Sequence, residues 1–207
     1  MSGFLVRAAR AADEAAVLAL AREEMSAHEK IDPRFLLRPD AMTRYALYLR
    51  DRMREIDSAV FVAEEEGKVI GVVIGSIRVQ NSFFESRRYG YVSDLVVDPA
   101  ARRRGVGRAL WERVVLWFRS LDVSVARLHI ATRSSDARSF WRSAGAEDFL
   151  AEAWIDLPQA AEIAASKHAD PASVRTAETA SAAREAERNV RGDSLRGDRL
   201  AGDTGVL

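Results

Sequence analysis

The segment YVSDLVVDPAARRRGVGRALWERVVLWFRSL, residues 91–121, decides the fold of this chain. Its first part is apolar and β-branched as far as Val97, which is the composition of a buried strand. Asp98 and Pro99 stop that strand. After Gly107, apolar residues recur with a helical period, at Leu110, Val114, Trp117, Phe118 and Leu121. The segment therefore predicts a strand, a turn rich in glycine and arginine, and a helix.

Such a turn is suited to holding an anion. The first N–H groups of a helix have no acceptor within the helix, and the aligned peptide dipoles leave about half a positive charge there. Gly105 and Gly107 lack Cβ atoms, so the backbone can approach a ligand closely, and Arg102 to Arg104 add positive charge. The pattern indicates a cradle for phosphate or pyrophosphate.

Two common phosphate motifs do not fit these residues. A Walker A loop ends in Gly-Lys-Ser/Thr, whereas Gly107 is followed by Arg108 and Ala109. A dinucleotide-binding fingerprint needs a third glycine where Leu110 stands. Both interpretations are therefore excluded.

The run Arg102-Arg103-Arg104-Gly105-Val106-Gly107, preceded by Leu95-Val96-Val97-Asp98-Pro99, has the pattern Arg-x-x-Gly-x-Gly after a strand. It closely resembles the acetyl-CoA motif of the GNAT family of N-acetyltransferases. The strand, the Asp-Pro break, the arginine, both glycines and the following helix agree with that motif in order and spacing. A surface helix that merely begins with arginine and glycine explains none of this flanking agreement.

The resemblance implies acetyl-CoA as co-substrate, no metal, and direct attack of an amine on the thioester without an acyl-enzyme. In the family, the pantetheine arm pairs with the backbone of the central strand, and the pyrophosphate is held by amides of the turn. The cofactor-binding residues expected here are Leu95, Val96, Val97, Arg102, Arg103, Arg104, Gly105, Val106, Gly107 and Arg108.

The resemblance also directs attention to the acid–base groups. The amine must lose a proton before it attacks, and the family often places a glutamate on the central strand for this. Ser93 occupies that position here, and Asp94 beside it is the expected base; its alternative role is to satisfy loop amides. In regular strand geometry the two side chains face opposite sides. The family tyrosine that protonates the thiolate is replaced by Trp141, which is expected to be a core residue or a cofactor-side wall, because an indole is not a useful acid.

Composition excludes several other classes of function. The 207 residues contain 31 Lys plus Arg and 31 Asp plus Glu, so bulk charge gives no reason to expect binding to nucleic acid or an anionic membrane. Cysteine is absent, which excludes disulfides and a cysteine nucleophile and suits a cytoplasmic protein. No signal peptide and no membrane-spanning apolar run is recognised.

The remaining pattern predicts an α/β (α+β) fold, a single GNAT-like domain over residues 1–158. Its mixed sheet would have about six or seven strands flanked by about four helices, and a flexible or partly helical tail would follow over residues 159–207. Strands are expected at residues 4–7, 59–64, 69–79, 91–97, 127–132 and 149–157. Helices are expected from Asp13, from Pro39 and Asp40, after Gly107, and at residues 135–144, with a loop at 28–38 and a hairpin at 65–68.

The expected function is transfer of acetyl from acetyl-CoA to the primary amine of a small molecule or peptide. The alternative is a non-catalytic acyl-CoA-binding module on the same fold. The acceptor is left open by the sequence, and a homodimer is compatible with the family. His129 is expected to be a hydrogen-bonded core histidine, and His28 to lie at a solvated helix end or near a site that attracts a cationic amine.

Overall fold

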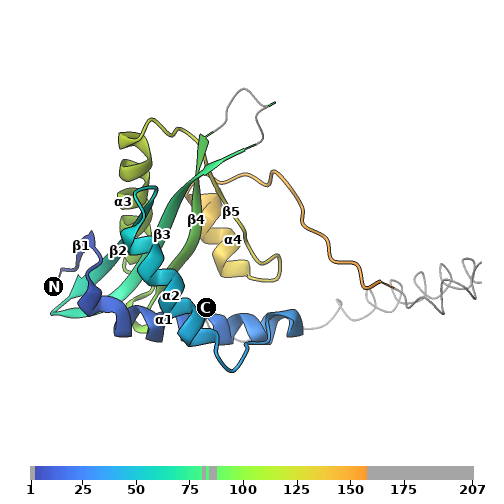
Figure 1. The fold of residues 1–207 in the computed structure, drawn as a ribbon, viewed down its shortest axis with the longest axis horizontal. Coiled ribbons are helices and arrows are strands. Elements are labelled where there is room, and N and C mark those ends of the chain that lie inside the picture. The colour runs from blue at the N-terminus through green and yellow to red at the C-terminus, as the bar shows by residue number, and fades with distance from the viewer. Residues whose placement is uncertain (1–2, 81–82, 84–87, 158–207) are drawn as a thin grey trace, which may run out of the picture. The chain divides into compact units, whose positions relative to one another are not determined.

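The computed structural model describes residues 3–80, 83 and 88–157 and contains one five-stranded sheet with helices against both faces (Figure 1). The strands are β1 (Leu5–Ala8), β2 (Ser58–Glu65), β3 (Lys68–Val79), β4 (Arg88–Val97) and β5 (Ala126–Leu128). The α-helices are α1 (Glu14–Ile31), α2 (Ala41–Arg54), α3 (Val106–Ser120) and α4 (Ser135–Ser143). Three short 3-10 helices are η1 (Ala11–Asp13), η2 (Pro33–Phe35) and η3 (Pro99–Ala101).

The sheet has the order β1-β2-β3-β4-β5, and each strand is hydrogen-bonded to its neighbour in the chain. Each neighbouring pair among the first four strands is antiparallel, and a short hairpin joins β2 to β3. At the β2–β3 hairpin, Glu66 and Gly67 have φ of 49° and 79°, as a two-residue type I′ turn requires. β4 and β5 are parallel, since α3 carries the chain back between them.

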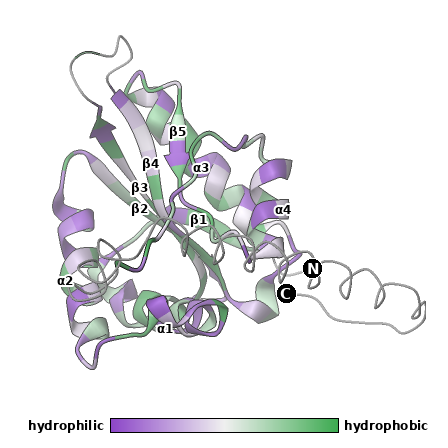
Figure 2. Cartoon of the chain, turned by 90° about the vertical axis from the view of Figure 1, so that its right-hand side faces the viewer, coloured by the Kyte–Doolittle hydropathy of each residue, from purple (hydrophilic) through white to green (hydrophobic). Residues whose placement is uncertain are grey.

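Each face of the sheet buries its own cluster of apolar residues. The helical pattern of α1 and α2 packs Val17, Leu20 and Leu49 against Val72 and Ile74 of β3, among other residues. The opposite face carries α3 and α4, and its cluster is formed by residues including Phe61, Val73, Val92, Leu110, Val114, Phe118 and Trp141. In Figure 2, hydrophobic and hydrophilic residues alternate along the helices, as expected for helices with one buried side. β4 lies between the two clusters.

The strand β4 requires a glycine where α3 crosses it. A Cβ atom on Gly90 would lie 2.7 Å from the Phe118 ring, and one on Gly75 of β3 would lie 2.5 Å from Val114. Such distances are too short for real side chains, so α3 packs this closely only because both positions lack one.

The element order expected from the sequence is confirmed through α4, with three corrections. The sheet has five strands in the described residues, fewer than the six or seven expected. Residues 28–31 continue α1, so the predicted loop begins later, at Asp32. Residues 149–157 form no strand, because their alternating apolar pattern is a local signal, while a strand also needs a neighbour to receive its hydrogen bonds.

Contacts within the chain divide it into two units, residues 1–147 and residues 148–207. The first unit contains every helix and strand described. The tail predicted for residues 159–207 lies outside the described residues. Among the described residues, no helix is both long enough and apolar enough to cross a membrane.

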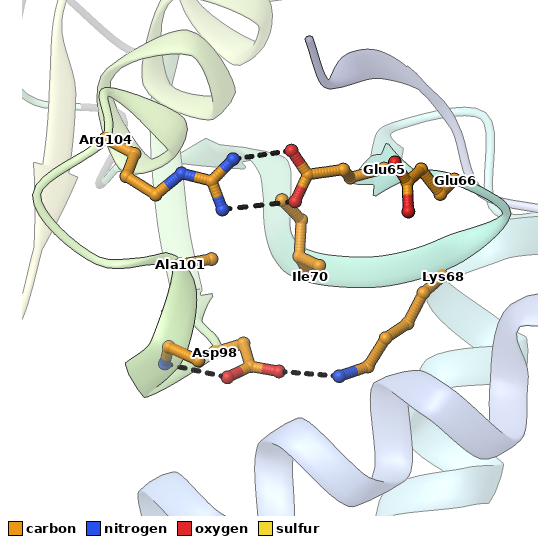
Figure 3. Close-up of a pocket in the computed structure, with 8 residues that line it drawn as sticks. Glu65, Glu66, Lys68, Ile70, Asp98, Ala101 and Arg104 are labelled. Carbon is orange, nitrogen blue, oxygen red and sulfur yellow. Dashed lines mark hydrogen bonds and ion pairs between the residues drawn. The ribbon is translucent and has the colours of Figure 1, made fainter. Parts of the chain in front are cut away.

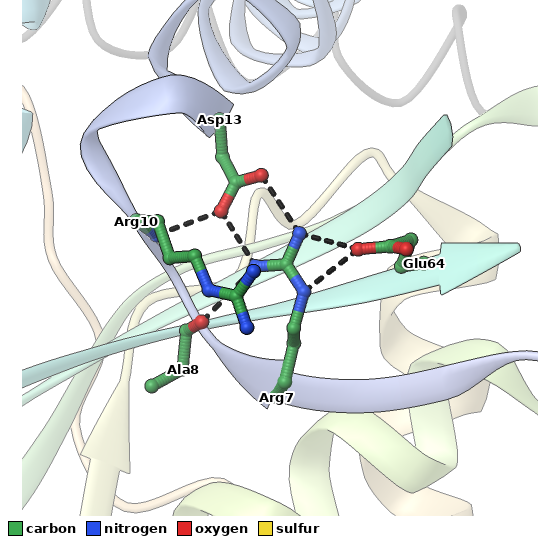
Figure 4. A network of polar contacts seen from close by, with 5 residues as sticks. All are labelled: Arg7, Ala8, Arg10, Asp13 and Glu64. Carbon is green, nitrogen blue, oxygen red and sulfur yellow. Dashed lines mark hydrogen bonds and ion pairs between the residues drawn. The ribbon is translucent and has the colours of Figure 1, made fainter. Parts of the chain in front are cut away.

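A charged network fixes the start of the chain to the sheet (Figure 4). Arg7 of β1 donates to both carboxylate oxygens of Asp13, at 2.7 and 2.8 Å, and its Nε donates to Glu64 of β2 at 2.7 Å. The Arg10 backbone N–H donates to Asp13 at 2.7 Å. The Arg7 and Asp13 side chains are only 16% and 9% exposed, and the guanidinium and these hydrogen bonds hold the pKa of Asp13 below its usual range.

Arg7→Met is expected to lower the free energy of unfolding by about 2–3 kcal/mol at neutral pH, because it leaves a largely buried carboxylate without its cation. The depressed Asp13 pKa means that this stabilisation is present above the unfolded pKa of about 4 and is lost as pH falls through the lower folded value. Urea unfolding of wild type and variant across this pH range measures the difference. Arg10→Met is the control, since it keeps the backbone N–H; an equal loss in that variant would contradict this account.

Candidate functional site

A β-bulge in β4 lies at the centre of the candidate site. In the register with β3, Val92 pairs with Gly75 and Asp94 pairs with Ile74, so Ser93 is an extra residue in β4. A bulge interrupts the alternation of side chains along a strand. The expectation that residues 93 and 94 face opposite sides is therefore wrong.

Both side chains instead contact tyrosines of α2. The Tyr45 hydroxyl donates to Asp94 Oδ1 at 3.0 Å, and the Tyr48 hydroxyl shares a hydrogen bond with Ser93 Oγ at 2.7 Å. The two tyrosines are neighbours on one face of the helix, with ring centroids 5.6 Å apart. The bulge and α2 thus assemble a cluster of one carboxylate and three hydroxyls, which we call the Asp94 cluster: Tyr45, Tyr48, Ser93 and Asp94.

The electrostatics of the Asp94 cluster favour a carboxylate that takes up a proton readily. Burial raises the pKa of Asp94 above its usual value, and the hydrogen bonds from Ser93, Tyr45 and Tyr48 offset this only in part. Burial, and then the charge of Asp94, raise the pKa of Tyr45, so this hydroxyl stays protonated and remains a donor. The cluster therefore holds a carboxylate whose proton affinity is above that of a solvated aspartate, a property that suits a general base.

Sequence reasoning found Asp94 and Ser93 but missed the two tyrosines. Tyr45 follows the apolar helical period of α2 together with Leu49, and it is buried, with 7% of its surface exposed. A buried tyrosine hydroxyl needs a hydrogen-bond partner. The available signal was the spacing of Tyr45 and Tyr48, which are three residues apart and therefore lie on one face of a helix. A helix that covers a strand with a carboxylate can bring such hydroxyls to it.

The strands β4 and β5 diverge beside the Asp94 cluster. Their pairing covers Gly90, Tyr91 and Val92 of β4 and ends where β5 ends, at Leu128. From Ser93 to Val97, the only strand of the described residues that pairs with β4 is β3. The backbone of Leu95, Val96 and Val97 consequently has one side outside the sheet ladder, the side that an extended ligand arm could occupy as an added strand. The Val96 side chain is buried on the face of the sheet that α1 covers, and the Leu95 and Val97 side chains are half-buried on the α3 face.

The turn after β4 leads directly into α3. Asp98 Oδ1 accepts from the Ala100 backbone N–H at 2.9 Å, which starts the short η3 helix. Gly105 is the N-cap of α3 with φ of 86°, a left-handed conformation that favours glycine, and no side chain caps the helix. Within the described part of the chain, no side chain accepts from the first N–H groups of α3, from buried Val106 to Arg108, and these groups are arranged as an anion site requires.

The arginines of this turn have different surroundings. Arg102 Nε donates to the Val97 carbonyl at 3.2 Å, and Arg104 pairs with Glu65 of β2 through both guanidinium ends. Arg108 donates to the Ser143 carbonyl of α4 at 3.0 Å. Arg103 is exposed, with φ of 60°, and within residues 3–80, 83 and 88–157 its side chain has no hydrogen-bonded or ion-paired partner. Three of the four arginines thus support the turn, and Arg103 is the one whose charge is available to a ligand.

A cavity of about 370 Å³ lies between this turn and the β2–β3 hairpin (Figure 3). Two ion pairs cross it: Arg104 with Glu65, and Lys68 with Asp98 at 3.3 Å. Because each cation here has an acidic partner, the cavity offers no net positive charge to a phosphate. Its contacts instead hold the turn against the hairpin, which fixes the start of α3.

The predictions for Trp141 and His129 have different outcomes. Trp141 is a core residue, 8% exposed, with edge-to-face contacts to Trp111 and Phe140 at 5.3 and 5.0 Å between ring centroids. His129 is not in the core: it lies just after β5, is exposed, and its Nδ1 is 3.1 Å from the Tyr91 hydroxyl. The apolar residues around His129 suggested a longer strand than the one that forms.

The chain matches the model of the Acetyltransferase (GNAT) family over residues 19–146. A mutant of the BH1408 protein from Bacillus halodurans is similar in structure, with 22% identity, a TM-score of 0.65, and coverage of 75% of this chain and 99% of that one. Aminoglycoside antibiotic 6'-N-acetyltransferase AAC(6')-IG from Acinetobacter haemolyticus is 17% identical, with a TM-score of 0.60 and coverage of 75% and 99%.

A third similar structure is AAC(6')-Iy in complex with the bisubstrate analog CoA-S-monomethyl-acetylneamine. It is 17% identical, with a TM-score of 0.61 and coverage of 76% of this chain and 100% of that one. No curated protein matches the sequence. The family match spans more than half of the chain, including the bulge, the turn and α3, and the similar structures share the fold that this segment builds. The chain therefore belongs to the GNAT family of acetyltransferases.

Proposed function

We propose that the chain is an N-acetyltransferase that moves an acetyl group from acetyl-CoA to a primary amine in a ternary complex. The observation that carries the proposal is the bulge at Ser93, which places a half-buried, hydrogen-bonded carboxylate where the pairing of β4 with β5 ends. The uncapped start of α3 lies at the far end of the same strand. The similar structure of AAC(6')-Iy in complex with a bisubstrate analog that contains CoA supports the choice of co-substrate.

Acetyl-CoA supplies the activated acetyl group. The residues expected to hold it are the backbone of Leu95 to Val97 and the amides from Arg103 to Arg108, with the Arg103 side chain adding charge. Protein packing does not require a glycine at position 107, since a Cβ there would make only ordinary contacts with Phe140 and Leu95, at 3.4 and 3.6 Å, and its absence instead lets a ligand approach the backbone. The backbone, more than any side chain, would therefore provide the binding groups.

Asp94 is the proposed base, and the hydroxyls of Ser93 and Tyr48 connect it to the surface of the site. The amine nitrogen forms a bond to the acetyl carbon, and the carbon–sulfur bond breaks. The proton that the amine loses passes to Asp94, directly or along the hydroxyls, and the CoA thiolate takes a proton from solvent. Tyr45 holds the Asp94 carboxylate in place through its hydrogen bond.

One observation favours a second function, a non-catalytic acyl-CoA-binding module. Trp141 replaces the family tyrosine and is buried against Trp111, so α4 presents no acid at that position. Thiol release from acetyl-CoA, measured with and without added amines and with mass analysis of the product, separates the two functions. Release that requires an amine and yields an acetylated amine supports the enzyme. Binding of acetyl-CoA with no release for any amine supports the module.

A further inference from the structure

The Asp94 cluster continues along the same face of the sheet into a pocket with a basic and aromatic lining. This pocket, of about 300 Å³, is lined by Arg78, Tyr89 and Tyr91. Arg78 pairs with Tyr89 in the β3–β4 register, so the two side chains share one face. Tyr91 precedes Asp94 by three residues, which corresponds to about 10 Å of strand or less. The pocket is therefore close enough for one small ligand to reach both.

Arginines on this face lie over aromatic rings. The Arg78 guanidinium is 5.4 Å from the centre of the Tyr91 ring, and Arg127 is 4.4 Å from that of Tyr89. Arg78 also donates to Ser76 Oγ at 3.3 Å, and it forms no ion pair with any carboxylate of the described residues. A guanidinium held in this way keeps donors available for a planar or tetrahedral anion.

The positive charge of the pocket extends to the Asp94 cluster. Arg52 of α2 lies 5.4 Å from the centre of the Tyr48 ring, and Arg52 and Arg78 both act to lower the pKa of Tyr48, against the larger effect of burial. Both guanidiniums are thus near the hydroxyl that contacts Ser93, but Arg52 is ion-paired with Glu55, so Arg78 supplies the charge that is available to a ligand. A ligand that occupies this pocket meets positive charge next to the proposed base.

Three carboxylates near the end of α1 already have polar partners. At the end of α1, Glu24 lies 3.6 Å from His28 Nδ1 and 3.9 Å from Arg102, and Glu29 accepts from the Leu37 backbone N–H at 2.8 Å. Asp32, just beyond α1, accepts from Arg34 and lies 3.5 Å from Arg133. These groups therefore offer little unpaired negative charge to a cationic amine.

We infer that the acceptor is an amine that also carries an anionic group, a carboxylate or a phosphate, which Arg78 binds while the amine lies beside the Asp94 cluster. This inference rests on the proposed function. It separates the protein from the similar aminoglycoside acetyltransferases, because an aminoglycoside carries several positive charges and would be repelled by Arg78.

The test compares amines in matched pairs. The carboxylate arm uses glycine, β-alanine and lysine, each with its carboxamide, and the phosphate arm uses phosphoethanolamine with ethanolamine. Neamine represents the aminoglycosides. In each pair, we call the amine that keeps the carboxylate or phosphate the anionic amine, and its counterpart without that charged group the neutral partner. We expect at least one anionic amine to exceed its neutral partner in kcat/KM, and the arm in which this occurs identifies the anion.

Arg78→Gln is expected to lower the ratio of kcat/KM between the anionic and the neutral amine by about 10- to 100-fold, the usual range for a charge-assisted hydrogen bond. The lower ratio should come from a higher KM for the anionic amine, with kcat little changed. Arg78→Lys should restore part of the ratio. Arg119→Gln, at an exposed position at the end of α3, is the matched control and should leave the ratio unchanged.

The outcomes distinguish this inference from the proposed function. If acetyl-CoA binds and neutral amines or neamine are acetylated as well as the anionic amines, the inference is wrong and the proposed function stands. If acetyl-CoA does not bind and no amine releases thiol, the proposed function is wrong. Calorimetric titration of the anionic amines then decides the inference alone: binding that Arg78→Gln abolishes supports it, and no binding overturns it.

Discussion

Asp94→Asn is expected to lower kcat about 100- to 10,000-fold, which is the usual contribution of a positioned general base. The asparagine keeps the size of the side chain and can still accept from the Tyr45 hydroxyl, but it cannot take the amine proton. In wild type, kcat/KM should fall as pH drops through the raised pKa of Asp94. That acidic limb should be absent in the variant. Thiol release measured across pH gives both results.

The same substitution should not destabilise the fold. Because the pKa of Asp94 is raised in the folded protein, its contribution to stability is present below the unfolded pKa of about 4 and is lost as pH rises through the folded value. The asparagine variant has no such loss, so at pH 8 it should unfold at the same urea concentration as wild type or at a higher one. An inactive variant that is also clearly less stable would indicate a structural role for Asp94 instead.

Gly105→Glu is expected to weaken acetyl-CoA binding about 100-fold or more, because a like charge placed against a phosphate costs several kcal/mol. The substitution puts a carboxylate at the N-cap of α3, where the φ of 86° also disfavours any side chain. A Cβ added at this position meets no protein atom within 4 Å, so the added bulk acts on the ligand and not on the core. Fluorescence titration with acetyl-CoA measures the change in affinity.

Gly67→Glu is the matched control for this variant. Gly67 has φ of 79° and equally open surroundings, but it lies in the β2–β3 hairpin. It therefore carries the same backbone strain and the same new charge in the hairpin that packs against the turn, and not at the N-cap of α3. Equal weakening in both variants would show that the effect comes from strain or general charge, and the assignment of the turn to the pyrophosphate would be wrong.

The sequence predicted the parts of this fold that depend on local signals. The strand and helix on either side of Gly105 follow from apolar periodicity, and the hairpin at Glu66 and Gly67 follows from the need for positive φ. The helical period of the apolar residues in α2 likewise agrees with the burial of Tyr45 and Leu49. Each of these signals lies within a few residues of the structure that it specifies.

Features that depend on pairing between distant residues were not predictable in the same way. The bulge at Ser93 exists only in the register between β3 and β4, and it decides that Ser93 and Asp94 share a face. Likewise, the end of β5 at Leu128 and the lack of a strand at residues 149–157 depend on which backbone finds a partner. The catalytic roles, a homodimer, a location in the cytoplasm and the lack of nucleic-acid binding remain predictions.

A crystal structure of the protein with acetyl-CoA would test the central claim most directly. The account predicts that the pantetheine arm lies along Leu95 to Val97, with the pyrophosphate at the start of α3 and the thioester beside Ser93 and Asp94. Acetyl-CoA on the other side of the turn, in the cavity of Lys68 and Arg104 shown in Figure 3, would contradict it. So would a bound thioester that has no access to the Asp94 cluster.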